Sequence, residues 1–134
     1  MGALLSRSMN NAAIRVLIAD DHRLFAEALE AILVGDDRIT VVGHAGDGEE
    51  AVRLASELTP DVVLMDISMP VMDGIEAAHT IRETDGGAQV LMLTGSNSRS
   101  DVDRARQAGA AGYVTKDRIA AELIDAIVEI ATSR

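Results

Sequence analysis

Residues 14–21 read IRVLIADD, a mostly apolar run of strand length that ends in two adjacent aspartates. Four further short apolar runs follow, each separated from the next by enough chain for a helix. We therefore predict strands over Ile14–Ala19 and over four later ranges, 39–45, 62–65, 90–93 and 112–115. Strands that alternate with helices in this way build right-handed βαβ units. The sequence thus predicts an α/β protein whose parallel sheet is covered by helices on both faces.

The segments between these runs carry the marks of helices. Apolar residues recur at helical spacing in the first helix, at Leu24, Phe25, Ala28, Leu29, Ile32 and Leu33, and in the last, at Ile119, Leu123, Ile127 and Ile130. Asp47 with Glu50 three positions later predicts the N-terminus of another helix, which should stop before Thr59. Gly109 predicts the end of a fourth helix.

The length of 134 residues suits one domain with one substantial core. Residues 1–13 carry no sustained period and precede the first strand, so we expect them to form a disordered leader. The folded domain is predicted to extend over residues 14–132.

Composition and charge exclude several classes of function. A formal net charge of −10 with no basic stripe disfavours nucleic-acid binding by this domain. The absence of Cys excludes disulfides, thiolate zinc sites and cysteine nucleophiles. One Phe, one Tyr and no Trp predict an aliphatic core and disfavour a large aromatic cofactor pocket. No apolar run approaches the roughly 18 residues of a membrane span, so we expect a cytoplasmic protein without membrane association.

Polar side chains stand where the predicted strands end. They are Asp20 and Asp21, Asp66, Thr94, and Thr115 with Lys116. The carboxyl ends of parallel strands meet at one edge of the sheet, so these side chains are expected to converge on a shallow pocket. Three crowded carboxylates need a counter-charge, and their hard oxygen atoms suit Mg²⁺ or Mn²⁺. The sequence therefore predicts a divalent metal site.

Such a site suits phosphoryl chemistry. A carboxylate beside a divalent ion can attack phosphorus and form an aspartyl-phosphate, while an ammonium neutralises charge on the transferred group. Lys116 would supply that ammonium, and it is the only Lys among 12 basic residues. A compact point charge is therefore present at the one place where this chemistry requires it.

Each of these residues also has an ordinary structural interpretation when taken alone. Asp20 and Asp21 could form the N-cap and first turn of a helix, and Asp66 could cap a turn. The triplet Lys116-Asp117-Arg118 could be a solvated charge run at the start of the last helix. Thr94 alone is uninformative. The occurrence of all of them at successive strand ends favours the shared site.

With these residues in place, the chain resembles the response regulator receiver domains of two-component systems over about residues 14–132. The resemblance rests on Asp20-Asp21, on Asp66 within LMDISMPVMDG, on Thr94 within LMLTGS, and on GYVTK at 112–116. IRVLIADDHRLFAEALEAIL and AGAAGYVTKD further resemble the NarL/FixJ (LuxR-type) branch, in which a helix-turn-helix output domain follows the receiver. The resemblance implies a flavodoxin-like (βα)5 doubly wound fold with strand order 2-1-3-4-5.

The family resemblance assigns a role to each candidate residue. Asp66 would accept a phosphoryl group from a sensor histidine kinase. Asp21 and Asp66 would ligate Mg²⁺ (or Mn²⁺) with the backbone carbonyl of Ser68, and Asp20 would assist through water. Lys116 would contact the phosphoryl oxygens. The implied protein is a signalling switch rather than an enzyme, with only autocatalytic phosphotransfer and autodephosphorylation.

The resemblance also implies a switch. The Thr94 hydroxyl would turn toward the phosphoryl group, and Tyr113 would swing inward behind it. The helix that ends at Gly109 and the strand over 112–115 would then present a changed face, which controls a homodimer, an output domain or a partner, with transcription as the expected output. Gly95 would leave room for the phosphodonor. Whether the chain acts alone or with a DNA-binding domain stays open.

Two other functions fit these residues less well. A phosphohydrolase with an aspartyl nucleophile needs a second acid two residues later, where this chain has Ser68. A pseudo-receiver that works without phosphorylation usually lacks an acid, the Thr or the Lys, and all are present here. His22, His44 and His79 sit singly on different predicted elements, so no histidine metal site is expected. A set of four methionines is expected in the core: Met65, Met69, Met72 and Met92.

Overall fold

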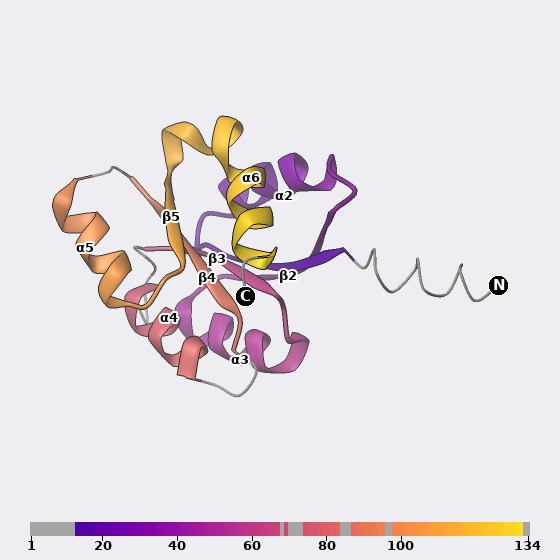
Figure 1. The fold of residues 1–134 in the computed structure, drawn as a ribbon. Helices are drawn as coiled ribbons and strands as arrows, with labels where there is room; N and C mark the ends of the chain where they lie inside the picture. Colours follow the sequence, from indigo (N-terminus) through magenta and orange to yellow (C-terminus); the bar gives the residue numbers. More distant parts are fainter. Residues whose placement is uncertain (1–12, 68, 70–73, 84–86, 96–97, 133–134) are drawn as a thin grey trace.

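The computed structural model describes residues 13–67, 69, 74–83, 87–95 and 98–132 (Figure 1). Five parallel strands form one sheet in the order β2-β1-β3-β4-β5, which confirms the predicted fold class. The strands are β1 (Ile14–Ala19), β2 (Ile39–Ala45), β3 (Val62–Asp66), β4 (Gln89–Thr94) and β5 (Gly112–Thr115). The helices are α2 (Arg23–Val34), α3 (Gly48–Leu58), α4 (Gly74–Glu83), α5 (Arg99–Gln107) and α6 (Ile119–Thr132), with a 3₁₀ turn, η1, at Lys116–Arg118.

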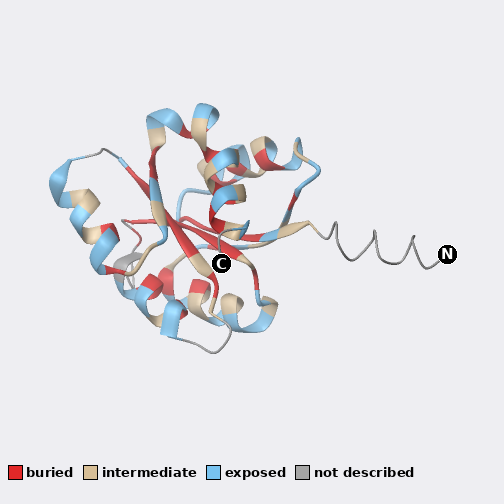
Figure 2. Ribbon diagram, viewed as in Figure 1, coloured by how far each residue is buried: buried red, intermediate tan, exposed pale blue. Residues whose placement is uncertain are grey.

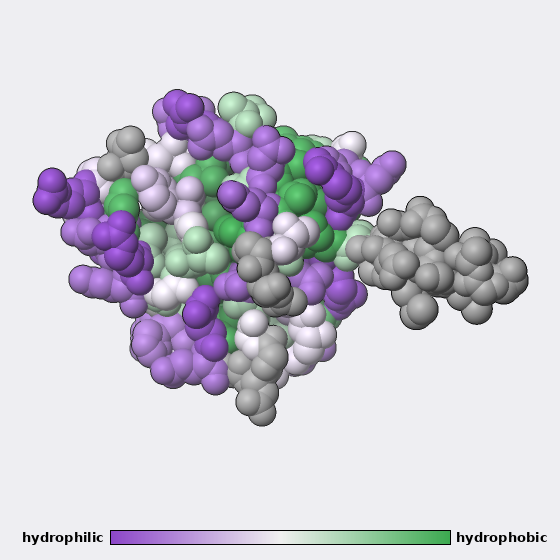
Figure 3. Space-filling model, viewed as in Figure 1, coloured by the Kyte–Doolittle hydropathy of each residue, from purple (hydrophilic) through white to green (hydrophobic). Residues whose placement is uncertain are grey.

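The sheet forms the buried middle layer of the molecule (Figure 2). Side chains alternate between its two faces along each strand, as the pleat requires. In β1, Val16 and Ile18 join the core beneath α2 and α6, whereas Leu17 and Ala19 join the core beneath α3, α4 and α5. Because both faces are covered, β3 is buried along its whole length. Hydrophilic side chains lie around the periphery of the view in Figure 3.

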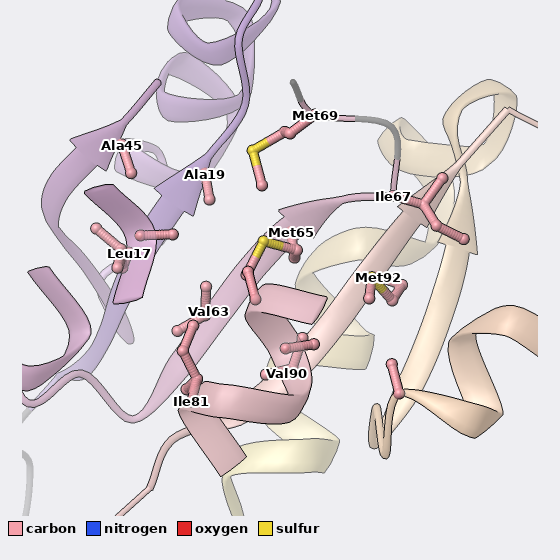
Figure 4. Packing of buried hydrophobic residues seen from close by; sticks show 14 of the residues in the cluster. Leu17, Ala19, Ala45, Val63, Met65, Ile67, Met69, Ile81, Val90 and Met92 are labelled. Atoms are coloured by element: carbon pink, nitrogen blue, oxygen red, sulfur yellow. The ribbon is translucent and has the colours of Figure 1, made fainter. Parts of the chain in front are cut away.

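The core is aliphatic, as the scarcity of aromatic residues predicts. Met65, Met69 and Met92 are buried, and Figure 4 shows them among aliphatic side chains on the α3–α5 face of the sheet. This confirms the core assignment of these three methionines, whereas Met72 lies outside the described residues. All four apolar positions predicted for the last helix, Ile119, Leu123, Ile127 and Ile130, are buried in α6.

The helix ends follow the predicted signals. Asp47 is the N-cap of α3, and its Oδ1 accepts a hydrogen bond of 2.8 Å from the backbone N–H of Glu50. The Glu50 carboxylate in turn accepts from the N–H of Gly46 at 2.7 Å. The helix stops at Leu58, before Thr59, as predicted. Gly109 follows α5 with φ of +80°, a left-handed conformation that favours glycine.

Replacing the N-cap should measurably weaken the fold. Asp47→Ala leaves the Glu50 N–H without its side-chain acceptor and is expected to lower the free energy of unfolding by about 1 kcal/mol. Urea denaturation followed by circular dichroism measures the change. Asp47→Asn is the control, because Asn caps helices about as well as Asp. An equal loss in both variants would show that the charge of Asp47, and not its capping hydrogen bond, stabilises α3.

Helix α2 differs from its predicted apolar stripe. Leu24 is 81% exposed and Ala28 is exposed, whereas Ala26, which the prediction left out, is buried with Leu29 and Leu33. At about 100° per residue, a position two residues from Ala26 lies on nearly the opposite side of the helix. The buried residues follow the 3–4 spacing that points toward the sheet, and Leu24 faces solvent in the first turn.

The predicted leader over residues 1–13 falls almost wholly outside the described residues, and the elements extend from Ile14 to Thr132. Among the described helices, none combines the length and apolar character that crossing a bilayer would require.

Candidate functional site

An acidic group forms where β1 and β3 end. One ligand atom from each of four residues lies within 4.8 Å of the others, and these residues are Asp20, Asp21, His22 and Asp66. The parallel pairing of β1 with β3 places both carboxyl ends at one edge of the sheet. Three of the four residues were predicted to meet here, and we call this set, with His22 included, the acidic cluster.

Asp20 is the most enclosed carboxylate of the acidic cluster, with a fully buried side chain. Its Oδ1 accepts a hydrogen bond of 2.8 Å from the backbone N–H of His22. Its Oδ2 is buried and has no hydrogen-bond partner among the described residues. Burial raises the pKa of Asp20, and the nearby Asp66 charge adds to this, although the His22 hydrogen bond opposes it. Asp20 therefore offers a buried oxygen atom suited to a cation.

The ionised side chain of Asp20 should lower the free energy of unfolding when no divalent ion is bound. The folded protein raises the pKa of Asp20 above its ordinary 3.8, so the ionised form destabilises the fold at neutral pH and protonation relieves this at low pH. Asp20→Asn is expected to increase the free energy of unfolding at pH 7 by about 1–2 kcal/mol. Below about pH 4 the gain should vanish.

Urea denaturation in EDTA at the two pH values provides the measurement for Asp20→Asn. The control is Asp37→Asn, because Asp37 is exposed. A loss of stability at pH 7 in Asp20→Asn would contradict the expectation.

Lys116 supplies the cation that faces the phosphoacceptor candidate. Its Nζ lies 3.6 Å from Oδ2 of Asp66, whose side chain is only 4% exposed. The same Nζ lies 4.9 Å from the centre of the Phe25 ring, a cation–π contact that orients the ammonium. When ionised, the three carboxylates and one ammonium carry a net charge of −2, which one divalent cation would neutralise. The buried Oδ2 of Asp20 and this charge balance both fit Mg²⁺ or Mn²⁺.

Two hydroxyls stand at the ends of the neighbouring strands. Thr94 is fully buried at the end of β4 and pairs in register with Thr115 of β5. Thr115 is also buried, and its Oγ1 has no hydrogen-bond partner among the described residues. Apart from its chain neighbours, an added Cβ at Gly95 would meet no atom of the described residues within 4 Å. Tyr113 is 41% exposed on β5, at the edge of the sheet.

The structure shows whether Asp20 or Asp21 caps a helix and what the triplet at 116–118 forms. His22, not Asp20 or Asp21, is the N-cap of α2, and its side chain makes no capping hydrogen bond. Helix capping by Asp20 or Asp21 is therefore wrong. The triplet at 116–118 forms η1, in which Arg118 pairs with Glu122 at 2.7 Å. Ser68, the predicted carbonyl ligand, lies outside the described residues.

Sequence reasoning missed His22. Its Nδ1 lies 3.6 Å from Oδ1 of Asp21 and 3.8 Å from Oδ1 of Asp20. The other two histidines are not members of the acidic cluster: His44 contacts Glu30, and His79 contacts Glu83. The available signal was the position of His22 directly after two aspartates at a strand end, because that position keeps its ring near both carboxylates.

Comparison with known proteins identifies one family. The sequence profile of the response regulator receiver domain matches residues 16–128. The transcriptional regulatory protein LiaR of Bacillus subtilis is 45% identical over 114 residues, which cover 85% of this chain and 54% of LiaR. The chemotaxis protein CheY of Halobacterium salinarum is 38% identical over 121 residues, which cover 90% of this chain and 99% of CheY.

A solved structure agrees with the sequence matches. The signal receiver domain of the response regulator NarL from Mycobacterium tuberculosis superimposes with a TM-score of 0.85 at 36% identity, covering 91% of this chain and 98% of that domain. The chain spans about half the length of several curated transcriptional regulators that it matches.

Proposed function

Because the chain belongs to the response regulator receiver domain family, we propose that Asp66 accepts a phosphoryl group from a histidine kinase in a reaction that requires Mg²⁺. The observation that carries this proposal is the position of the Asp66 carboxylate, which is buried at a strand end, within the acidic cluster and 3.6 Å from the only lysine. A nucleophile, acidic metal ligands and a neutralising ammonium are the parts that phosphoryl transfer to a carboxylate needs.

Asp66, Lys116 and the acidic metal ligands would each have a separate role in this transfer. An oxygen atom of Asp66 attacks phosphorus, a P–O bond forms, the P–N bond to the donor imidazole breaks, and the imidazole keeps the electron pair. Lys116 holds its ammonium beside Asp66 and neutralises charge on the transferred oxygens. Asp20, Asp21 and Asp66 would hold Mg²⁺ together with the Ser68 carbonyl. When bound, Mg²⁺ neutralises negative charge on the transferred group.

The output of the proposed switch depends on two residues of the neighbouring strands, Thr94 at the end of β4 and Tyr113 in β5. Thr94 is expected to turn its hydroxyl toward the phosphoryl group, and Tyr113 to move from its exposed position into the space behind it. These movements would bias the face formed by α5 and β5 between two pre-existing states. Several relatives are transcriptional regulators, so we propose that this face controls a homodimer or a DNA-binding partner domain in the cytoplasm. The protein would then act as a signalling switch and not as an enzyme on small molecules.

Intact-mass spectrometry tests this proposal directly. The chain is incubated with Mg²⁺ and acetyl phosphate, and the product is then cleaved and mapped at low pH to preserve the acyl-phosphate. We expect one labile phosphoryl adduct, on the peptide that contains Asp66, and none when EDTA replaces Mg²⁺. An adduct on another peptide, or none with either Mg²⁺ or Mn²⁺, would overturn the assignment.

A further inference from the structure

The end of β5 carries a buried hydroxyl that the proposed phosphoryl chemistry does not use. Thr115 is only 7% exposed, and its Oγ1 has no hydrogen-bond partner among the described residues. A buried hydroxyl without a partner destabilises the conformation in which it occurs. Such a group calls for an explanation, and one explanation is a partner that arrives in a second conformation.

Thr115 faces the same side of the sheet as Tyr113. Val114, which lies between them, is buried in the core beneath α2 and α6, so its two neighbours point toward the other face, where α5 lies. Thr115 also pairs in register with Thr94 at the end of β4. The unpartnered hydroxyl is therefore on the same face as both residues of the proposed switch.

A Tyr113 side chain that moves inward would need a partner for its phenol, because a tyrosine hydroxyl that leaves water is usually hydrogen-bonded. Among the described residues, the buried polar or charged side chains are Asp20, Asp66, Thr94 and Thr115. The proposed function commits the two aspartates to the metal ion and the phosphoryl group, and Thr94 to the phosphoryl group. Thr115 is the one that remains.

The spacing along β5 suits a contact between the two side chains. Residues two positions apart on a strand are separated by about 6.4–6.8 Å, and strand side chains lean along the strand. A tyrosine side chain is long enough to bring its hydroxyl to the level of Thr115. Tyr113 also borders a hollow of about 220 Å³ between α5 and β5, lined in part by Ala105, Ala110 and Ala111. The ring therefore has free volume beside it.

We propose that Thr115 is a positioning residue of the switch: when Tyr113 moves inward, its phenolic O–H donates a hydrogen bond to Thr115 Oγ1, which holds the ring in place. This inference rests on the proposed function, because the inward movement belongs to that proposal. The unpaired hydroxyl destabilises the outward state and is satisfied in the inward one. Thr115 thus shifts the equilibrium toward the state that the phosphoryl group favours.

Equilibrium binding of BeF₃⁻, a stable mimic of the phosphoryl group, measures this shift. Beryllium is titrated into the whole chain in excess Mg²⁺ and fluoride, and calorimetry gives an apparent affinity, which scales with the population of the competent state. Thr115→Val removes the hydroxyl and keeps the shape of the side chain, whereas Thr115→Ser keeps the hydroxyl. The matched control is Thr40→Val, because Thr40 is an exposed threonine on β2.

We expect Thr115→Val to lose roughly three- to tenfold of its BeF₃⁻ affinity, and Thr115→Ser and Thr40→Val to stay within about twofold of wild type. Without Mg²⁺ and BeF₃⁻, Thr115→Val should unfold at a higher urea concentration than wild type, because it no longer buries an unpaired hydroxyl. An unchanged affinity or a lower urea midpoint in Thr115→Val, or an equal loss of affinity in either other variant, would overturn the inference.

A double-mutant cycle identifies the partner of Thr115. Tyr113→Phe removes only the phenolic hydroxyl, so it should lose BeF₃⁻ affinity by the same factor as Thr115→Val. The double variant should lose no more than either single variant, because both substitutions remove the same hydrogen bond. Losses that multiply in the double variant would show that the two hydroxyls act separately, and the pairing would then be wrong.

The inference and the proposed function fail in different ways. Labelling of wild type by acetyl phosphate with Mg²⁺ is measured in parallel. A labelled wild type whose BeF₃⁻ affinity equals that of Thr115→Val overturns the role of Thr115 and leaves the phosphoacceptor assignment standing. A wild type that neither becomes labelled nor binds BeF₃⁻ overturns the proposed function and the role of Thr115 together.

Discussion

Asp66→Asn is expected to abolish phosphorylation by acetyl phosphate completely. Asn keeps nearly the same shape at the end of β3, but its neutral amide oxygen is a poor nucleophile toward phosphorus. The substitution also removes the negative charge that faces Lys116 at 3.6 Å. Intact-mass spectrometry over a time course measures the loss, and circular dichroism checks that the variant is folded.

One rival explanation for a loss in Asp66→Asn is weaker Mg²⁺ binding, because Asp66 is also a member of the acidic cluster. Repeating the reaction at rising Mg²⁺ concentrations separates the two effects. An adduct that returns at high Mg²⁺ would show that Asp66 serves only as a metal ligand and that another residue accepts the phosphoryl group. Asp37→Asn is the matched control, because it makes the same change at an exposed aspartate.

Lys116→Met should slow phosphorylation by roughly a hundred- to a thousandfold, the usual cost of removing one group that stabilises developing charge. Met has a similar length and keeps the contact with Phe25, so the variant loses the ammonium and little packing. Mg²⁺ affinity should rise by several-fold at the same time, because a positive charge no longer repels the ion from the carboxylates. Mass spectrometry gives the rate, and calorimetry gives the affinity.

The opposite directions of these two effects distinguish electrostatics from structural damage. A variant that merely disturbs the site would lose both phosphorylation and Mg²⁺ binding, and that outcome would contradict the role given to Lys116. Arg118→Met is the control. Arg118 lies in the same turn, but it is exposed and paired with Glu122 at 2.7 Å. Its removal should leave the rate and the Mg²⁺ affinity unchanged within a factor of about two, since surface ion pairs contribute little.

The sheet could be predicted from sequence because its three central strands, β1, β3 and β4, are mostly buried on both faces. Runs such as Val62–Met65 are continuously apolar, and an aspartate follows at once, so both the strand and its end are visible. Parallel pairing then places Asp20, Asp21, Asp66 and Lys116 at the same edge of the sheet. The family resemblance added the strand order, which the structure confirms.

The exposed parts of α2 and of the acidic cluster could not be predicted in the same way. Leu24 looked like part of a buried stripe because its spacing suits a helix, but burial depends on which face the helix turns to the sheet. His22 looked isolated because its carboxylate neighbours come partly from another strand and partly from adjacent residues, whose directions the sequence does not give. The movements of Thr94 and Tyr113 stay predictions, since they require a second state.

The half-exposed position of Tyr113 gives the protein a built-in optical reporter. Tyr113 is the only tyrosine, and the chain contains no tryptophan. Tyrosine emission of the unlabelled protein therefore comes from one side chain, at the edge of the sheet beside α5. A change in its quenching as acetyl phosphate is added would follow the inward movement in real time, without a dye, a label or an engineered residue.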